Sequence, residues 1–371
     1  MTVDICLFFA TSGHSGVDVA VRHLVPELVR RGYSVALLKV REHGPSLDFS
    51  HERFMAIDLG ARHVYTALPA LVRWLRELQP KVILSDKDRV NRTALLARKL
   101  SGVASRLVLS SGTTISIDLR HRGRFECWLQ RNSMGRLYPL ADSVIVTSRG
   151  VAEDMAAYTG LGRERITVVP SPVVPDSLFA APQPRPDHPW FGARCKPVIL
   201  AVGELGRRKG FDMLLQAFAL LRERVDARLV ILGAGRQREE LVAMASQLGI
   251  SGHVDFAGFV SNPYAFMAHA DVLAFTSRWE GLGFVLIEAM SMGTPVVATD
   301  CPSGPAEILD GGRYGPLVPV DHAEQMAKGL AATLRSPPDS DSLRTAVRRY
   351  SVSAATDAYL DVFGLPRWKS H

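Results

Sequence analysis

Residues 280–300 read EGLGFVLIEAMSMGTPVVATD, and the order of residue types in this stretch decides the fold. Gly281 and Gly283 permit a tight turn, and the apolar run that begins at Phe284 predicts a helix that ends at Gly293. An apolar strand then starts at Pro295. Helices that alternate with buried strands in this way indicate a parallel sheet covered on both faces.

Two carboxylates flank the start of this predicted helix: Glu280 precedes the turn, and Glu288 lies inside the helix. The unpaired N–H groups and the positive dipole end of a helix start favour phosphate. A sugar nucleotide, with a sugar on one side of its diphosphate and a ribose on the other, could meet one carboxylate with each hydroxyl-rich group. The alternative is that both glutamates are ordinary surface residues. The apolar elements around Glu288 favour a bound partner, because a carboxylate enclosed by them needs one.

The composition is that of a globular protein with room for two cores, since the chain has 371 residues, of which 47% are hydrophobic and 22% charged. No run reaches the roughly 18 apolar residues that cross a bilayer, and residues 1–5 predict a strand rather than a signal peptide. We therefore expect a cytoplasmic protein, with a peripheral position on the inner face of the plasma membrane if it binds lipid. Reduced thiols and no bound metal are expected, because the cysteines are far apart and lack metal-ligand spacing. They are Cys6, Cys127, Cys195 and Cys301.

Periodicity predicts two doubly wound α/β domains that face each other across a cleft. In the first half, strands are expected near 3–9, 34–40, 81–84, 106–110, 143–147 and 165–169, with helices near 16–31, 66–78, 90–101, 124–140 and 148–158. In the second half, strands are expected near 197–203, 228–232, 253–256, 271–276 and 295–299, with helices near 210–223, 236–248, 262–270, 283–292 and 321–335. The predicted organisation is a first domain at 1–176, a proline-rich linker at 177–196, a second domain at 197–351, and a helix within 352–371 that crosses back to the first domain. Ligands of such sheets bind at the carboxyl ends of the strands.

A basic turn supports this site. The segment from Gly203 to Gly210 reads GELGRRKG between a predicted strand and a predicted helix, and its three successive cations could bind a diphosphate. A basic surface turn is the alternative interpretation. Gly233 and Gly235 follow the next strand and are a weaker signal. Residues 11–16 link the first predicted strand to a helix that starts at Gly16, and this turn would present backbone N–H groups toward the cleft; a plain tight turn is the alternative.

Positive charge is concentrated in the first half, where residues 1–175 hold 24 Lys and Arg against 16 Asp and Glu. Much of it lies in 87–136, where arginines alternate with apolar residues such as Phe125 and Trp128. A solvated basic face and a binding surface are both compatible with this pattern. If it binds, anionic lipid or a diphosphate headgroup is favoured over nucleic acid, because no nucleic-acid motif accompanies the charge.

Taken together, these motifs resemble the retaining, sugar-nucleotide-dependent glycosyltransferases of family 4, which have the GT-B fold. The likeness is most specific over residues 203–320, and residues 299–309 look like bacterial members that add hexoses or N-acetylhexosamines to polyprenyl-linked glycans. The resemblance implies that Glu280 contacts the donor sugar, Glu288 the ribose, and Arg208 and Lys209 the diphosphate. The candidate catalytic residues are therefore Glu280, Arg208 and Lys209, and the candidate donor-binding residues are Gly16, Gly203, Val260, Leu282, Gly283, Phe284 and Glu288.

The resemblance further implies a UDP-sugar donor, no cofactor and no metal requirement, and a glycan or polyprenyl-diphosphate acceptor in surface polysaccharide assembly. It implies that the domain at 1–176 binds the acceptor and that the domain at 197–351 binds the donor. Two departures stand out: Glu204 occupies the place of a family arginine, and Gly112 lies near the place of a family histidine. The alternative functions are a UDP-sugar epimerase of the same build and a non-catalytic nucleotide-sugar or glycan binder.

Overall fold

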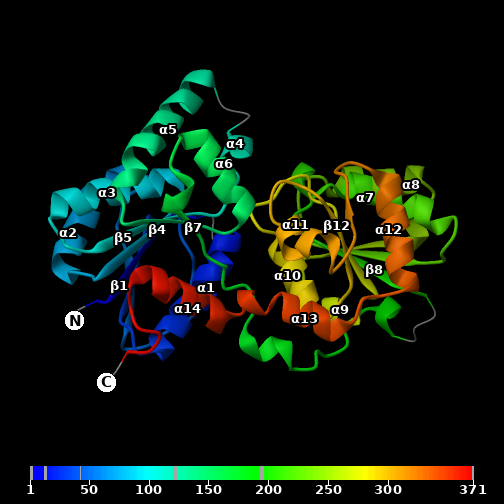
Figure 1. Cartoon of the computed structure of the whole chain (residues 1–371). Coiled ribbons are helices and arrows are strands. Elements are labelled where there is room, and N and C mark those ends of the chain that lie inside the picture. Colours follow the sequence, from blue (N-terminus) through cyan, green and yellow to red (C-terminus); the bar gives the residue numbers. More distant parts are fainter. Residues whose placement is uncertain (1–2, 12–14, 42, 120–122, 193–195, 370–371) are drawn as a thin grey trace. The chain divides into compact units, whose positions relative to one another are not determined.

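The computed structural model describes residues 3–11, 15–41, 43–119, 123–192 and 196–369. The chain divides into two compact units, the first made of Met1–Pro175 with Tyr350–His371 and the second of Asp176–Arg349. Each unit is a parallel sheet with helices on both faces (Figure 1).

Within the described residues, the first unit has a seven-stranded parallel sheet in the order β3-β2-β1-β4-β5-β6-β7. Its strands are β1 (Ile5–Phe9), β2 (Val35–Lys39), β3 (Phe54–Asp58), β4 (Val82–Asp86), β5 (Arg106–Ser111), β6 (Ser143–Val146) and β7 (Ile166–Val168). Its helices are α1 (Gly16–Arg30), α2 (Leu68–Leu78), α3 (Asp88–Ser101), α4 (Ile115–Asp118), α5 (Arg124–Leu137), α6 (Arg149–Thr159) and α14 (Val352–Phe363).

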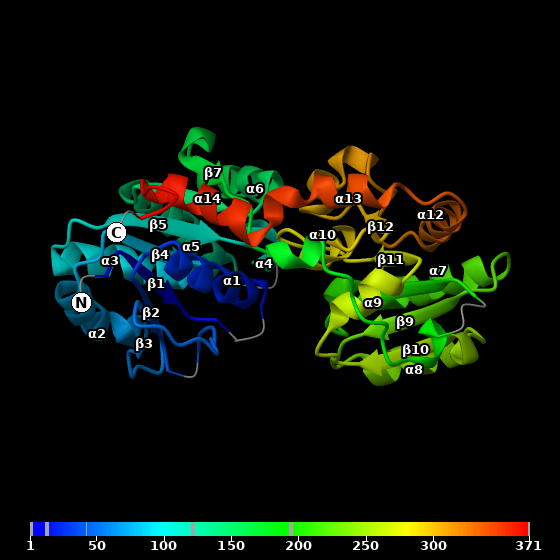
Figure 2. The same cartoon turned by 90° about the horizontal axis from the view of Figure 1, so that it is seen from below.

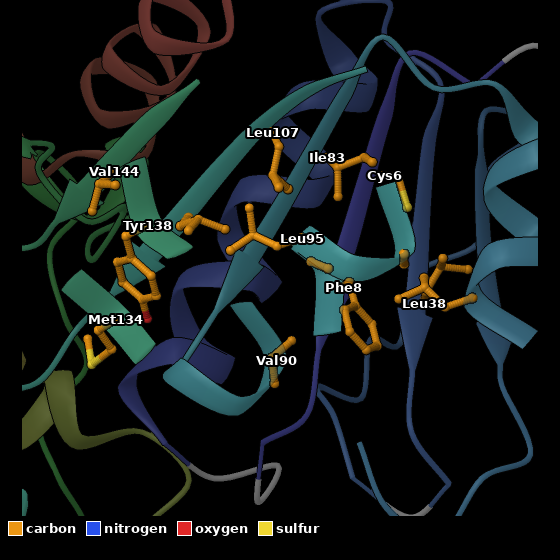
Figure 3. Close-up of a cluster of buried hydrophobic side chains, with 14 of the residues drawn as sticks. Cys6, Phe8, Leu38, Ile83, Val90, Leu95, Leu107, Met134, Tyr138 and Val144 are labelled. Atoms are coloured by element: carbon orange, nitrogen blue, oxygen red, sulfur yellow. The ribbon is translucent and has the colours of Figure 1, made fainter. Parts of the chain in front are cut away.

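The central strands β1 and β4 of this sheet are buried on both faces, and their successive side chains point to opposite sides. Cys6 and Phe8 belong to one apolar cluster, with side chains from α2, α3, α5 and α6. Figure 3 shows Phe8 in this cluster beside Val90 and Leu95 of α3. The alternate residues of β1 belong to a second cluster with α1 and α14, and Figure 2 shows α14, in red, along the first unit.

In the described part of the second unit, six parallel strands are ordered β10-β9-β8-β11-β12-β13. They are β8 (Val198–Val202), β9 (Arg228–Leu232), β10 (Val254–Gly258), β11 (Val272–Phe275), β12 (Val296–Thr299) and β13 (Leu317–Val318). Its helices are α7 (Phe211–Arg222), α8 (Arg238–Gln247), α9 (Pro263–His269), α10 (Phe284–Ser291), α11 (Pro305–Ile308), α12 (Ala323–Arg335) and α13 (Ser340–Ala346). Side chains of α7, α8 and α12 share an apolar cluster with one face of the strands.

The proline-rich segment 177–196, predicted as a linker, belongs to the second unit. Phe191 is buried and stacks edge-on against Phe266 of α9, with ring centroids 5.3 Å apart. His188 Nε2 lies 2.9 Å from Asp255 Oδ2. These contacts anchor the segment to the unit that it precedes, so low periodicity here reflects irregular packing rather than a free connection.

The chain returns to the first unit at Tyr350, whose carbonyl accepts hydrogen bonds from the N–H groups of Val173 and Val174 at 3.0 and 3.2 Å. Among the helices of the described residues, none has the length and apolar character needed to span a membrane. Cys6, Cys127 and Cys301 form no disulfide within the described residues, and the predicted thiol at Cys195 lies outside them.

Candidate functional site

The candidate residues of the second unit lie in the segments that follow the carboxyl ends of parallel strands, and two of them, Phe284 and Glu288, lie in α10. Gly203 follows β8, Val260 follows β10, and the loop from 276 to 283 connects β11 to α10. Parallel strands place all these ends on one edge of the sheet, which is where ligands of such sheets bind. Gly16 is the exception among the candidates, because it is the first residue of α1 in the other unit.

Glu280 is the centre of a buried charge cluster at this edge. Arg208 Nη1 donates to its Oε2 at 2.6 Å, and Lys209 Nζ donates to its Oε1 at 2.7 Å. Ser277 Oγ donates to the same Oε1 at 2.9 Å. Burial alone would raise the pKa of Glu280, but the ammonium of Lys209 and the guanidinium of Arg208 hold that pKa below its ordinary value. The carboxylate is therefore charged. It forms ion pairs with Arg208 and Lys209, the two cations that the sequence analysis predicts to bind a diphosphate.

The basic turn is the 3₁₀ helix Arg207–Lys209, and a glycine makes room for its lysine. A Cβ on Gly203 would lie 2.9 Å from Lys209 Cε. Lys209 is buried, and its ammonium lies 5.4 Å from the centre of the Phe275 ring. The absence of a side chain at Gly203 leaves this space to the lysine.

The loop after β9 packs on the loop after β8, backbone against backbone. A Cβ on Gly233, whose φ is +134°, would lie 1.9 Å from the Gly203 carbonyl oxygen, and one on Gly235 would lie 2.3 Å from the Leu205 carbonyl oxygen. These two glycines, a weak signal in the sequence, therefore shape the edge that holds Lys209.

The helix start next to Glu280 is set by Gly283, the residue before α10. Its φ of +99° is in the left-handed region, and a Cβ there would lie 3.2 Å from Phe275 Cζ. Leu282 is buried beside it, while Phe284 is half-buried in the first turn of the helix. The sequence between the two glutamates thus forms the turn and helix start that its glycines predict.

Glu288 lies one turn further along α10, four residues after Phe284 and therefore on the same side of the helix. Tyr264 of α9 donates a long hydrogen bond, 3.4 Å, to its Oε1. Burial raises the pKa of Glu288 to about 7, against a smaller lowering effect of the Tyr264 hydroxyl and of Lys209. Unlike Glu280, this carboxyl is poised to lose or gain a proton near neutral pH.

Two buried carboxylates of the first unit were missed by the sequence analysis. Asp18 of α1 accepts hydrogen bonds from the Ser15 N–H at 2.7 Å and from the Thr11 hydroxyl. Asp86, at the carboxyl end of β4, is buried with its Oδ2 unpartnered, and burial raises its pKa to about 6. Neither is part of a motif that a single sequence shows. The rest of the turn before Gly16, residues 12–14, lies outside the described residues.

No group of three or more His, Cys, Asp or Glu side chains that could hold a metal ion occurs in the described parts of the chain. Positively charged side chains and a helix start are instead the anion-binding groups present at the carboxyl edge of the second sheet.

Two parallel, doubly wound units, one with a basic turn and two carboxylates around a helix start, define an α/β protein of the GT-B type. Residues 192–350 match the family described as glycosyl transferases group 1, and residues 15–172 match the glycosyl transferase 4-like domain. The chain is 31% identical over 268 residues to the Campylobacter jejuni N-acetylgalactosamine-N,N'-diacetylbacillosaminyl-diphospho-undecaprenol 4-alpha-N-acetylgalactosaminyltransferase, an alignment that spans 72% of this chain and 70% of that protein. The chain belongs to the family 4 glycosyltransferases.

Another relative is the GDP-mannose-dependent alpha-(1-6)-phosphatidylinositol monomannoside mannosyltransferase of Mycolicibacterium smegmatis, 35% identical over 172 residues that span 44% of this chain and 45% of that protein. Among solved structures, Anabaena HepE in complex with UDP matches with a TM-score of 0.78 at 17% identity, over 98% of this chain and 100% of that chain. These findings confirm the predicted family, the GT-B fold and the enzyme class, a glycosyltransferase.

Proposed function

We propose that this glycosyltransferase moves a hexose or N-acetylhexosamine, with retention of configuration, from a UDP-sugar to a glycan or polyprenyl-diphosphate-linked acceptor. The observation that carries the proposal is the arrangement around α10. One carboxylate, Glu280, precedes the helix start and bonds both cations of the basic turn, and a second, Glu288, lies one turn inside the helix. A nucleotide sugar has a hydroxyl-rich group on each side of its diphosphate. The two carboxylates would each meet one of these groups, and the cations and the helix start between them would meet the diphosphate.

In the proposed reaction, the bond between the anomeric carbon and the diphosphate oxygen breaks as the acceptor hydroxyl oxygen attacks the same face of the sugar. The acceptor proton passes to the leaving phosphate oxygen. Negative charge that develops on this leaving group would be stabilised by Arg208, Lys209 and the N–H groups at the start of α10. No step in this scheme requires a metal ion or a cofactor.

The test is a donor panel with and without acceptor. UDP-glucose, UDP-N-acetylglucosamine, UDP-N-acetylgalactosamine and GDP-mannose are each incubated with the enzyme, and nucleoside diphosphate release and product mass are measured. Acceptor-dependent release with one UDP-sugar supports the proposal. Turnover with GDP-mannose alone would mean that the donor is a GDP-sugar and not a UDP-sugar. Interconversion of UDP-sugars without release would indicate an epimerase, and binding without any turnover a silent nucleotide-sugar binder.

A lipid-linked acceptor is proposed because the named substrate of the Campylobacter jejuni relative is a diphospho-undecaprenol and that of the Mycolicibacterium smegmatis relative is a phosphatidylinositol mannoside. We propose that the first unit binds this acceptor and meets an anionic membrane surface through α5.

The helix α5 supports this part of the proposal through its exposure. Of its described residues only Met134 is buried, and Figure 1 shows the helix at the outside of the first unit beside α6. Phe125 and Trp128 are 75% and 58% exposed, and their rings stack 6.0 Å apart. Trp128, Arg124 and Arg131 also line a hollow of about 400 Å³. Exposed aromatic rings beside arginines suit the interface of an anionic bilayer.

Co-sedimentation with vesicles tests α5 directly. Replacing Arg124 and Arg131 by glutamate should weaken binding to phosphatidylglycerol vesicles about tenfold or more, because each surface cation contributes ~1 kcal/mol. The matched control changes Arg62 and Arg73, exposed arginines of the same unit, in the same way. Equal losses for both pairs would indicate a non-specific effect of net charge, and no binding by the wild type would favour a soluble acceptor.

A further inference from the structure

Arg278 connects the loop before α10 to three other segments of the second unit. Its Nη1 donates to the Arg207 carbonyl at 2.7 Å, its Nη2 to Asp212 Oδ2 at 2.8 Å, and its Nε to Asp321 Oδ1 at 2.7 Å. The side chain is only 16% exposed. No feature of the sequence distinguishes this arginine from the other cations of a surface turn.

The basic turn is attached to this loop through three successive carbonyls. The Arg207 carbonyl accepts from the Arg278 side chain, the Arg208 carbonyl from the Arg278 N–H at 2.7 Å, and the Lys209 carbonyl from Thr276 Oγ1 at 2.8 Å. Every peptide group that carries a cation of the turn is therefore fixed from the segment 276–278. The positions of Arg208 and Lys209 depend on this attachment.

Only a guanidinium can make the three side-chain bonds together. Its five N–H donors point in fixed, divergent directions, whereas a lysine ammonium is a single point. The carboxylates of Asp212 and Asp321 both face the guanidinium, and the hydrogen bond that Arg278 donates to Asp212 is the largest of the effects that raise the pKa of Arg278. The carbonyl of Arg207 accepts the bond from the third nitrogen, Nη1, so the bonds of Arg278 hold the turn while its charge faces two carboxylates.

We infer that Arg278 is a positioning residue that fixes Arg208 and Lys209 for a diphosphate, without touching the diphosphate itself. This inference rests on the proposed function, since it assigns the two cations to the donor. Without the Arg278 side chain the turn keeps the backbone bond to Arg208 and the Thr276 bond, but it loses the anchor at Arg207 and the links to α7 and Asp321. The turn would remain folded with its two cations less well placed.

Calorimetric titration of R278Q with UDP, uridine and inorganic pyrophosphate tests the inference. We expect affinity for UDP and pyrophosphate to fall about tenfold, and affinity for uridine to stay within about twofold. In turnover assays the loss should enter through the donor KM more than through kcat. R278K should fall between R278Q and the wild type, because an ammonium cannot replace all three bonds.

The matched control is R222Q. Arg222 has a similar environment in the same unit, with a side chain 21% exposed that bonds Asp226 Oδ1 at 3.2 Å and the Ala227 carbonyl at 3.0 Å. These partners precede β9, at the opposite end of the strand from the site. R222Q should bind all three ligands like the wild type, even if it lowers the melting temperature as much as R278Q does.

Equal affinities of R278Q and the wild type for UDP and pyrophosphate would overturn the inference, as would equal losses for UDP and uridine. A failure of the proposed function would give a different result: the wild type would bind pyrophosphate but would have no measurable affinity for UDP. If the wild type bound no diphosphate at all, both the inference and the proposed function would be wrong.

Discussion

Glu280 pairs with both cations of the basic turn that the proposed function assigns to the diphosphate. Its carboxylate pairs with Arg208 and Lys209, so under the proposed function a donor diphosphate would compete with this anion for the same two cations. Truncating one partner of a buried ion pair leaves the others uncompensated, which favours binding of another anion in its place.

Replacing Glu280 by glutamine should therefore separate binding from transfer. We expect E280Q to bind UDP several-fold more tightly than the wild type, because both cations are released, and to transfer sugar at least about tenfold more slowly. Calorimetry and product assays measure the two effects. Weaker UDP binding in E280Q would show that the carboxylate does not compete with the diphosphate.

Glu288 makes a prediction about pH. Its pKa of about 7 lies above the ordinary 4.5, so the folded protein holds this proton more tightly than the unfolded chain. The stability that results is fully present below about pH 4.5 and is lost as the pH rises through 7. Glutamine cannot lose a proton, so the wild type should lose roughly 1–3 kcal/mol relative to E288Q between pH 5 and pH 8.5.

Urea unfolding of both proteins at the two pH values measures this difference. Groups that titrate in both proteins, such as Asp86, cancel in the comparison. A constant difference between wild type and E288Q across the range would mean that Glu288 is ionised throughout.

The sequence predicted which residues lie at the edge of the second sheet but not how they pair. Glycine positions and the run of cations place Arg208 and Lys209 near the start of α10, and the structure brings both onto Glu280. Arg278 could not be found in this way, because its role depends on Asp321, which is distant in sequence. Asp86 was missed because burial, rather than a neighbour in sequence, makes it unusual.

At the scale of elements, prediction succeeded where strands are buried on both faces. The central strands β1, β8 and β11 were expected within a few residues of their bounds because they are continuous apolar runs. The edge strand β3 was missed, since its residues are only half-buried and one of them is a terminal aspartate. The two-residue strand β13 and the four-residue helices α4 and α11 are too short to show a period.

The contact between the loops after β8 and β9 predicts the cost of adding one methyl group. Gly233→Ala should destabilise the second unit by about 3 kcal/mol or more, because the backbone is strained for alanine and the Cβ would overlap the Gly203 carbonyl. Gly249→Ala is the control, since Gly249 has a φ of +69° but nothing within 4 Å of the added Cβ. It should cost only about 1–2 kcal/mol. Similar losses in urea unfolding would mean that the loops can move apart.

At the scale of the whole molecule, each unit has its own apolar core, and the chain returns to the first unit at Tyr350. Leu360 of α14 is fully buried against α1 and the first sheet, and Leu330 of α12 is fully buried in the second unit. Each leucine-to-alanine change should cost about 2–5 kcal/mol. We expect L360A to lower stability in the first unit and L330A in the second.

Hydrogen exchange read by mass spectrometry assigns each loss to a unit. Faster exchange in α1 and β1 for L360A, with α7 unchanged, is the expected result, and L330A should show the reverse. Parallel loss of protection in both units for either variant would mean that the two units unfold as one.

The return of the chain also sets an order of events during synthesis. Residues 176–349 leave the ribosome before α14 does, at a pace of about 5 to 20 residues per second. During the roughly 10 to 35 s in which these residues are added, the face of the first sheet that α14 will cover is without its last helix, and the chain of the second unit is complete before α14 is made. The half of the enzyme that is translated first is therefore finished last.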